Sequence, residues 1–366
     1  MEKNKNHYAI IMAGGIGSRF WPYSRTQRPK QFLDILGIGK TLLQSTYERF
    51  LKAFEKDNIY IVTNQSYIPL IKEQLPDIND KCLLGEPIAK NTAACIAYAT
   101  SKIHEENTHG VFIVAPSDHL ILNENAFIES VELAMNYAKS NKALITLGIK
   151  PNRPDTGYGY IQYIENDKDK KINKVKTFTE KPSLDLAQTF IESGDFLWNA
   201  GIFIWSGSTI REAFKTHLPE FFELFNNASK FFNKPEEASI IQSAYEQCRS
   251  VSIDVGLMEK AQNVFVIPGD FGWSDLGTWA SLYDYSDQKD DGKNVVFDKS
   301  TRLYNDTTNC LVSSSLNKNK LIVLNGVNNL IVVDTDDVLL ISDKSKEQEI
   351  KQIVADVKLK YDEKYS

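Results

Sequence analysis

Three closely spaced glycines follow the first apolar run of the chain. Residues 8–12 have the pattern of a buried strand, and Gly14, Gly15 and Gly17 come directly after them. Glycines allow positive φ angles and bring backbone N–H groups close to a ligand. Several such N–H groups together form a concave binding site for an anion. The spacing therefore predicts a phosphate-binding loop at the end of the first strand.

Cationic side chains accompany this loop, although the net charge of the chain is −6. Residues 3–33 contain no Asp or Glu, and their cations are Lys3, Lys5, Arg19, Arg25, Arg28 and Lys30. Arginine and lysine supply the full charges that a triphosphate requires. A glycine-rich turn with solvated arginines is the alternative, since isolated glycine motifs often occur without a ligand. Arg19 and the segment 29–31 favour nucleotide phosphate over that alternative.

Length and composition indicate a globular chain of two domains, or of one large domain with an appendage. It has 366 residues, of which 42% are hydrophobic and 25% charged. No apolar run approaches the ~18 residues of a membrane span, and residues 1–7 are too polar for a signal peptide. The four cysteines do not have the paired spacing of metal ligands, and we expect them to be reduced thiols. They are Cys82, Cys95, Cys248 and Cys310. The mild acidity argues against a nucleic-acid partner. We therefore expect a cytoplasmic protein without a membrane partner.

Apolar runs and helical patterns alternate over the first 150 residues. Strands are expected at 8–12, 59–63, 81–84, 111–115 and 143–147, and helices at 41–54, 66–74, 91–104 and 126–138. Thr41 and Gln44 form the spacing of a capping box at the first helix. This alternation predicts an α/β fold with a Rossmann-like, doubly wound, mostly parallel sheet. Ligands of such sheets bind at the carboxyl ends of the strands, where the glycine loop and residues 115–119 fall.

The pattern changes after residue 150. Strands are expected at 158–164, 171–179, 201–205 and 264–268, with helices at 183–192 and within 208–247. From about residue 287 onwards, short apolar runs recur at roughly 10-residue spacing up to residue 342, and an amphipathic helix follows at 347–359. Such regular short strands predict a small β-helix-like domain, in which no catalytic group stands out.

Motifs throughout residues 8–280 resemble those of the mannose-1-phosphate guanylyltransferases, also called GDP-mannose pyrophosphorylases. They occur in that family's order and are Gly14-Gly15-Ile16-Gly17-Ser18-Arg19-Phe20-Trp21-Pro22, Pro29-Lys30-Gln31-Phe32, Glu86-Pro87, Asn91-Thr92-Ala93, Pro116-Ser117-Asp118-His119, Thr156-Gly157-Tyr158-Gly159-Tyr160-Ile161, Phe178-Thr179-Glu180-Lys181-Pro182, Trp198-Asn199-Ala200-Gly201, Ser252-Ile253-Asp254 and Trp273-Ser274-Asp275-Leu276-Gly277. Ser18, Lys90 and Ala94-Cys95 depart from the family's usual residues, the last two beside the expected base site.

The resemblance implies a nucleotidyltransferase, GT-A-like catalytic domain at 1–286 and a left-handed β-helix-like domain at 287–366 that ends in a helix. The nucleotide-binding part spans about 1–150 and the sugar-phosphate part about 151–286. No fused isomerase domain is expected, because the chain ends soon after the β-rich region. The implied reaction joins GTP and mannose 1-phosphate into GDP-mannose and diphosphate, with Mg²⁺ assistance. A homodimer is also expected.

Particular residues carry the implied chemistry. Arg19 and Lys30 are expected on the triphosphate and Lys181 on the sugar phosphate, with Arg25 as a further candidate. Asp118 and Asp275 are the expected Mg²⁺ ligands, because hard cations prefer carboxylate oxygens, and Asp270 is the next choice. Asp118 as a helix N-cap and Asp275 as a turn former are the structural alternatives. His119 is expected to support structure.

The nucleotide is expected to contact a set of residues at the strand ends: Ala13, Gly14, Gly15, Gly17, Glu86, Asn91 and Ser117. A carboxylate at Glu86 can accept both the N1–H and the exocyclic amine of guanine, a pattern that adenine does not offer. The structural alternatives are a turn at Glu86 and a helix cap at Asn91.

The hexose phosphate is expected to contact Gly157, Tyr158, Gly159, Glu180, Lys181 and Asn199. A plain turn is the alternative for residues 157–159, and Asp254 and Glu259 are expected to be structural. Two rival functions stay open. One is a nucleotidyltransferase that uses another hexose 1-phosphate or another nucleotide, and the other is a non-catalytic sensor of sugar nucleotides. A dinucleotide-dependent oxidoreductase is disfavoured, because no ribose-binding acid follows the second strand.

Overall fold

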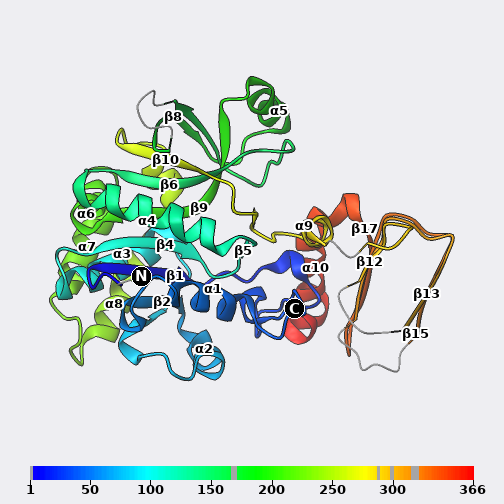
Figure 1. Ribbon diagram of the computed structural model, residues 1–366. Coiled ribbons are helices and arrows are strands. Elements are labelled where there is room, and N and C mark those ends of the chain that lie inside the picture. The colour runs from blue at the N-terminus through cyan, green and yellow to red at the C-terminus, as the bar shows by residue number, and fades with distance from the viewer. Residues whose placement is uncertain (1–2, 166–170, 287–288, 297–300, 315–320) are drawn as a thin grey trace. The chain divides into compact units, whose positions relative to one another are not determined.

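The computed structural model describes residues 3–165, 171–286, 289–296, 301–314 and 321–366 (Figure 1). Its residues fall into two compact units. Unit 1 comprises residues 1–14, 46–117 and 121–273, and unit 2 comprises residues 15–45, 118–120 and 274–366. The domain limits expected from the sequence, with a boundary at residue 287, remain a prediction. No helix among the described residues is long and apolar enough to cross a bilayer.

Four parallel strands form the first half of the nine-stranded sheet in unit 1. Their order is β3 (Leu83–Glu86), β2 (Ile59–Asn64), β1 (His7–Met12) and β4 (Val111–Pro116). The residues at the centre of β1 are completely buried, because its neighbours pair with it on both sides and helices cover both faces. The carboxyl ends of all four strands lie at one edge, as the alternating pattern predicts.

The second half of the sheet is mixed. Its strands, in order, are β9 (Phe196–Ser206), β6 (Leu144–Ile149), β10 (Val264–Gly269), β8 (Asn173–Thr179) and β7 (Tyr160–Ile164). β9 is antiparallel to both β4 and β6, and it begins five residues before the strand expected at 201–205. The α/β class is confirmed by this sheet and by the family comparisons below.

Helices cover the sheet on both faces (Figure 1). α4 (Glu124–Ser140) covers one face, and α3 (Asn91–Glu106) and α6 (Gly207–His217) cover the other. α7 (Pro219–Ser229) and α8 (Glu237–Gln247) pack behind α3, and α2 (Ile68–Gln74) and α5 (Leu184–Ser193) complete unit 1. α1 (Leu42–Leu51) begins at the expected capping box, in which Thr41 and Gln44 exchange side-chain to backbone hydrogen bonds of 2.9 and 3.2 Å.

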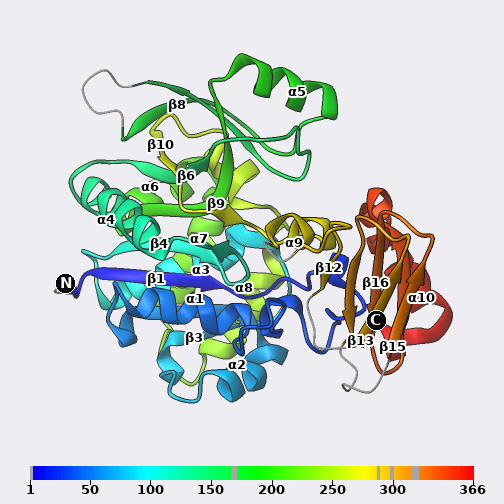
Figure 2. The same cartoon turned by 45° about the vertical axis from the view of Figure 1, so that its right-hand side comes forward.

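Parallel strands in unit 2 repeat at intervals of 20 residues. One sheet contains β12 (Val295–Val296), β14 (Leu311–Ser314), β16 (Leu330–Asp334) and β17 (Leu339–Asp343). The other contains β13 (Thr301–Asn305), which the sequence did not predict, and β15 (Leu321–Asn325). This repeat is the expected β-helix-like element, and α10 (Ile350–Tyr361) lies beside it (Figure 2).

The core of unit 2 joins residues that are far apart in the sequence. Phe20 and Trp21 pack with Trp279 of α9 (Trp279–Tyr285) and with inward side chains of β14 and β16. The Trp279 indole N–H donates to the Trp21 carbonyl at 3.2 Å. Two short strands, β5 (Leu120–Ile121) and β11 (Trp273–Ser274), lie where the chain passes from one unit to the other. The aromatic core therefore fixes the segment that carries Arg19.

Candidate nucleotidyl-transfer site

The glycine loop is shaped by close packing against Lys30. Gly17 has φ +67°, and a Cβ there would lie 2.5 Å from Cβ of Lys30, so a larger residue cannot fit. Gly15 differs, because a Cβ there would meet no described atom within 4 Å. A ligand can therefore approach the backbone at Gly15 without steric hindrance.

Arg19 lies in the single helical turn Ser18–Phe20. Its Nε is buried and has no hydrogen-bond partner among the described residues. A buried unpaired donor on a cation costs free energy, so this atom is suited to an anionic ligand. Phosphate binding by Arg19 stays a prediction, and the unpaired state of this atom among the described residues is consistent with it.

Lys30 is the centre of the charged cluster in unit 2. Only 3% of this residue is exposed. Its Nζ donates to the backbone carbonyls of Asp275 and Leu276 at 2.8 and 2.9 Å, and it pairs with Oδ2 of Asp118 at 2.8 Å. Leu276 has φ +43°, an unfavourable conformation for a branched side chain that turns its carbonyl toward the ammonium. Three segments expected at the site thus meet at one cation.

Asp118 has the properties of an ionised ligand. Burial acts to raise the pKa of its carboxyl, but the charges of Lys30 and His119 and the hydrogen bond from Lys30 act in the opposite direction and leave the pKa lowered. The side chain is 28% exposed, and is therefore within reach of a bound ion. Asp275 Oδ1 accepts from the backbone N–H of Gly277 at 3.0 Å.

These two aspartates fit a hard divalent cation by their chemistry. Lys30 contacts Asp118 through its carboxylate and Asp275 through its backbone carbonyl, and carboxylate oxygens are the donors that Mg²⁺ prefers. Within the described part of the chain, no group of three His, Cys, Asp or Glu side chains is arranged for a metal. A metal at Asp118 and Asp275 would therefore need further oxygen ligands from phosphate or water.

Glu86 ends β3 in unit 1 and points toward the glycine loop. It is buried, and its Oε1 accepts from the Tyr245 hydroxyl at 3.1 Å. Its Oε2 lies 3.2 Å from the position of a Cβ on Gly14, so glycine there permits the close approach. Burial raises the pKa of Glu86 to about 7, although the hydrogen bond from Tyr245 opposes the rise. Tyr245 was not anticipated from the sequence, because it lies 159 residues away on α8.

The other expected nucleotide contacts lie at the same edge of the sheet. Ala13 donates its N–H to the Val62 carbonyl at 2.7 Å and accepts from the Thr63 hydroxyl at 2.8 Å. Ser117 is buried and donates its N–H to the Met12 carbonyl at 3.0 Å. Asn91 opens α3 with φ +64°, and its side chain accepts from the next N–H, of Thr92, at 2.8 Å. It is exposed and is not the usual N-cap, a position that Lys90 occupies.

The expected sugar-phosphate residues of unit 1 form a second cluster. A Cβ on Gly159 would lie 2.6 Å from Oε2 of Glu180, so this glycine gives the carboxylate its space. Glu180 is hydrogen-bonded to the Lys181 ammonium, and Lys181 adopts φ +46° with most of its side chain exposed. Tyr158 packs at the edge of the Trp198 ring, with centroids 4.9 Å apart. Gly157 donates its N–H to Asp155 at 2.8 Å.

Two acids that the sequence analysis expected to be structural contact this cluster. Asn199 donates its Nδ2 hydrogen to Asp254 Oδ1 at 2.9 Å, and its Oδ1 accepts from the Thr146 hydroxyl at 2.8 Å. Burial, followed by the charge of Glu180, raises the pKa of Asp254 to about 6. Glu259 accepts from the Glu180 backbone N–H at 3.0 Å. Asp254 opens a π-helical turn, a feature frequent at functional sites, and the structural role expected for both acids stays a prediction.

Arg25 and Asp270 receive other surroundings. The Arg25 guanidinium makes a two-point contact with the carboxylate of Asp337, and its pKa is raised chiefly by that hydrogen bond. A phosphate contact by Arg25 would have to compete with this pairing, and it stays a prediction. Asp270 is exposed in the loop after β10.

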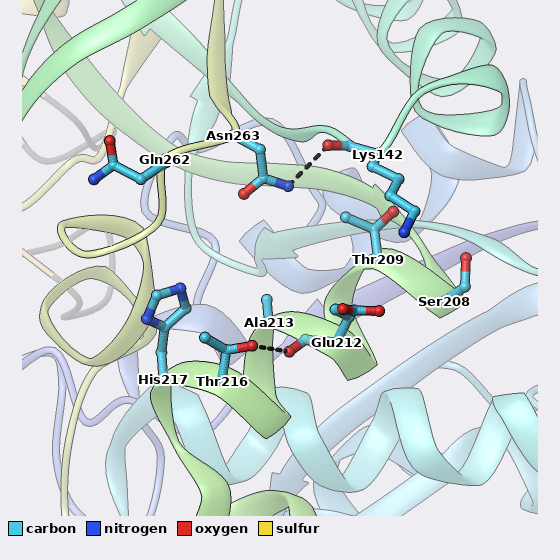
Figure 3. A pocket seen from close by; sticks show the side chains of 9 residues that line it. All are labelled: Lys142, Ser208, Thr209, Glu212, Ala213, Thr216, His217, Gln262 and Asn263. Atoms are coloured by element: carbon cyan, nitrogen blue, oxygen red, sulfur yellow. Dashed lines mark hydrogen bonds between the residues drawn. The ribbon is translucent and has the colours of Figure 1, made fainter.

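A hollow of about 390 Å³ opens elsewhere on unit 1 (Figure 3). It lies beside α6 and beside the starts of β6 and β10, where Asn263 donates to the Lys142 carbonyl at 2.8 Å. The strands begin there, whereas Gly14, Glu86 and Ser117 lie where strands end. This hollow is therefore separate from the expected site.

Comparison with known proteins supports the motif-based inference. A family model described as "Nucleotidyl transferase" matches residues 8–292, and one described as "MannoseP isomerase/GMP-like beta-helix domain" matches residues 303–357. Mannose-1-phosphate guanylyltransferase of Escherichia coli (strain K12) is 34% identical over 359 residues, covering 96% of this chain and 73% of that protein. The protein of the same name from Salmonella muenchen is 36% identical over 350 residues, with 94% and 72% covered.

A solved structure has the same fold. It is described as mannose-1-phosphate geranyltransferase from Thermus thermophilus, and it matches with a TM-score of 0.86 at 30% identity over 96% of this chain and 99% of that one. The chain thus belongs to the nucleotidyl transferase family, a class of enzymes. Within this class it is a member of the mannose-1-phosphate guanylyltransferase family, as its motifs indicated.

Proposed function

We propose that this chain transfers the guanylyl group of GTP to α-D-mannose 1-phosphate and releases diphosphate. The observation that carries the proposal is the buried ammonium of Lys30, which binds the Asp118 carboxylate and the Asp275 carbonyl. The E. coli and Salmonella relatives support the choice of substrates by their name, mannose-1-phosphate guanylyltransferase.

The reaction is a single in-line displacement. An oxygen of mannose 1-phosphate attacks the α-phosphorus of GTP, and the bond from that phosphorus to the oxygen bridging to the β-phosphate breaks. Diphosphate leaves with that oxygen, and no covalent enzyme intermediate forms. Such a transfer depends mostly on positioning and on neutralising charge.

The cations divide this work. Arg19, with its unpaired buried Nε, and Lys30 bind the triphosphate and the departing diphosphate. Lys181 binds the sugar phosphate, and its partner Glu180 accepts hydrogen bonds from hexose hydroxyls. Asp118 and Asp275 would hold Mg²⁺. When bound, the ion neutralises phosphate charge and orients the phosphates.

Glu86 selects the base. Its carboxylate accepts the N1–H and the exocyclic amine of guanine, and Gly14 leaves space for its Oε2. A pKa of about 7 means that the carboxylate is only partly ionised near neutral pH in the free protein. Bound guanine, by donating to the carboxylate, would favour the ionised form.

A diphosphate-release assay tests the proposal. GTP, ATP and UTP are each combined with mannose 1-phosphate, glucose 1-phosphate and other hexose 1-phosphates in the presence of Mg²⁺. We expect GTP with mannose 1-phosphate to give the highest kcat/KM. A faster pair would identify a transferase for that hexose or nucleotide, and GDP-mannose binding without diphosphate release would identify a sensor.

A cytoplasmic location and a homodimer remain part of the proposal. The four cysteines are free and buried, which suits a reducing compartment. Sedimentation of the full chain tests the homodimer, and a single monomer mass at micromolar concentration would contradict it.

A further inference from the structure

A hydrogen bond from α8 fixes the buried carboxylate that faces the glycine loop. The Tyr245 hydroxyl lies 3.1 Å from Oε1 of Glu86, and Tyr245 itself is completely buried. A carboxylate has two oxygens, and Oε2 is the one beside Gly14. The contact with Tyr245 therefore determines how the plane of the carboxylate is turned.

Tyr245 is in turn held rigidly. Its ring meets Phe225 and Tyr98 edge to face, with centroids 5.7 and 6.2 Å apart. The helix that carries it is fastened at its first residue, because Glu237 binds the Lys102 ammonium through both oxygens, at 2.5 and 2.6 Å, and accepts from the Tyr98 hydroxyl at 3.2 Å. This packing holds the Tyr245 ring in place, so its hydroxyl donates to Oε1 of Glu86 from a fixed position.

Three titratable side chains of the described residues interact electrostatically with Glu86. They are Tyr245 of α8 and Cys95 and Tyr98 of α3, and burial raises the pKa of each. All three stay protonated near neutral pH, so Tyr245 remains a donor. A donor held against one oxygen stabilises the ionised carboxylate and leaves the remaining lone pairs for a ligand.

We propose that Tyr245 is a positioning residue for base recognition, which holds Oε1 of Glu86 so that the carboxylate faces a donor-rich purine edge beside Gly14. The inference rests on the proposed function, because it explains how that site distinguishes guanine from bases that lack its two donors. Tyr245 acts through Glu86 and need not touch the substrate.

The variant Tyr245→Phe tests this role with GTP and ITP. Inosine keeps N1–H but lacks the exocyclic amine, so it probes one of the two contacts. We expect kcat/KM for GTP to fall about tenfold, the size of a hydrogen bond to a charged group, and that for ITP to fall clearly less. The loss should be in KM for GTP, while kcat and KM for mannose 1-phosphate change little.

The pH profile provides a readout that packing alone would not move. The Tyr245 hydrogen bond lowers the pKa of Glu86, so its removal should shift the acidic limb of kcat/KM for GTP to higher pH. Tyr60→Phe is the matched control, because it removes a buried hydroxyl that donates to the carboxylate of Glu106 rather than to Glu86. It should change neither the ratio of kcat/KM for GTP to that for ITP nor the pH of the acidic limb.

The proposal would be overturned if kcat/KM fell equally for GTP and ITP, or if the acidic limb of the GTP profile stayed at the same pH. Should Tyr245→Phe fail to fold, 3-fluorotyrosine placed at position 245 keeps the hydroxyl and strengthens it as a donor. The limb should then move to lower pH, and no movement would also overturn the proposal. If the unsubstituted chain does not prefer GTP to ATP, the proposed function fails instead, so the two failures are distinguishable.

Discussion

The phosphate region around Lys30 and the base region around Glu86 both shield a carboxylate from water, but they give it different partners. Asp118 faces a full positive charge at 2.8 Å, and the pKa of its carboxyl is lowered. Glu86 faces a neutral hydroxyl at 3.1 Å, and burial raises its pKa to about 7. A cation compensates for lost hydration, whereas one neutral donor does so only in part.

The difference matches the ligands proposed for each region. The phosphate region must stay charged at every working pH, because its proposed ligands are a polyanion and a metal. The base region needs only a hydrogen-bond acceptor for a neutral base. Its carboxylate can therefore lack a charged partner until guanine binds and donates hydrogen bonds to it. Variants that remove one partner at a time test whether the two regions differ in this way.

Removal of Lys30 should have the largest effect. In Lys30→Ala, we expect turnover to fall by about 10³, because a buried cation for the phosphates and the counter-charge of Asp118 are lost together. Diphosphate release at saturating substrates measures the change. Lys346→Ala, at an exposed position of unit 2, is the control and should keep normal turnover. Near-normal turnover in Lys30→Ala would remove this residue from the mechanism.

Asp118→Asn should come next. The variant keeps the shape of the side chain but removes its charge, so turnover should fall by about 10² and the Mg²⁺ concentration for half-maximal rate should rise. Asp336→Asn, at an exposed position, serves as the control. An unchanged Mg²⁺ requirement would show that Asp118 does not hold the ion.

Glu86 should make folding stability depend on pH in the direction opposite to Asp118. Its folded pKa of about 7 exceeds the ordinary value of 4.5, so the folded protein binds this proton more tightly. Ionisation of the buried Glu86 therefore destabilises the folded protein relative to the unfolded chain. This effect is absent below the ordinary pKa, grows as pH rises, and is complete above about pH 7, where it is on the order of 3 kcal/mol. The lowered pKa of Asp118 instead adds stability that is lost in acid.

Urea denaturation between pH 5 and 8 measures this contribution. We expect Glu86→Gln to gain free energy of unfolding relative to the unsubstituted chain as pH rises. Glu129→Gln, at an exposed position, should show no such trend. Parallel curves for Glu86→Gln and the unsubstituted chain would mean that Glu86 is not an ionised buried group above pH 7.

Gly159→Ala should give the smallest effect. The added methyl would lie 2.6 Å from Oε2 of Glu180, so that carboxylate must move. We expect KM for mannose 1-phosphate to rise about tenfold through one lost hydrogen-bonded contact, with KM for GTP unchanged. A rise in KM for GTP alone would assign this cluster to the nucleotide instead.

The local features of the fold could be predicted from the sequence. Apolar runs of four to six residues between helical patterns specified β1 to β4, and Thr41 with Gln44 specified the start of α1. The glycine spacing also located the loop at the end of β1, whose phosphate-binding role stays a prediction. Less regular runs misled the analysis: β9 begins earlier than expected, and β13 was missed because Thr301–Asn305 mixes polar and apolar residues.

Local sequence patterns specify which residue types stand at the strand ends, because glycine conformations, apolar periodicity and helix caps act over a few neighbouring residues. The partners of these residues depend on how the chain folds in three dimensions. Lys30 meets Asp275 across 245 positions, Tyr245 meets Glu86 across 159, and Asn199 meets Asp254 across 55. These contacts depend on the order in which strands join the sheet and on helix packing against it, which no local pattern encodes. Burial, and with it the opposite pKa shifts of Asp118 and Glu86, follows from that packing.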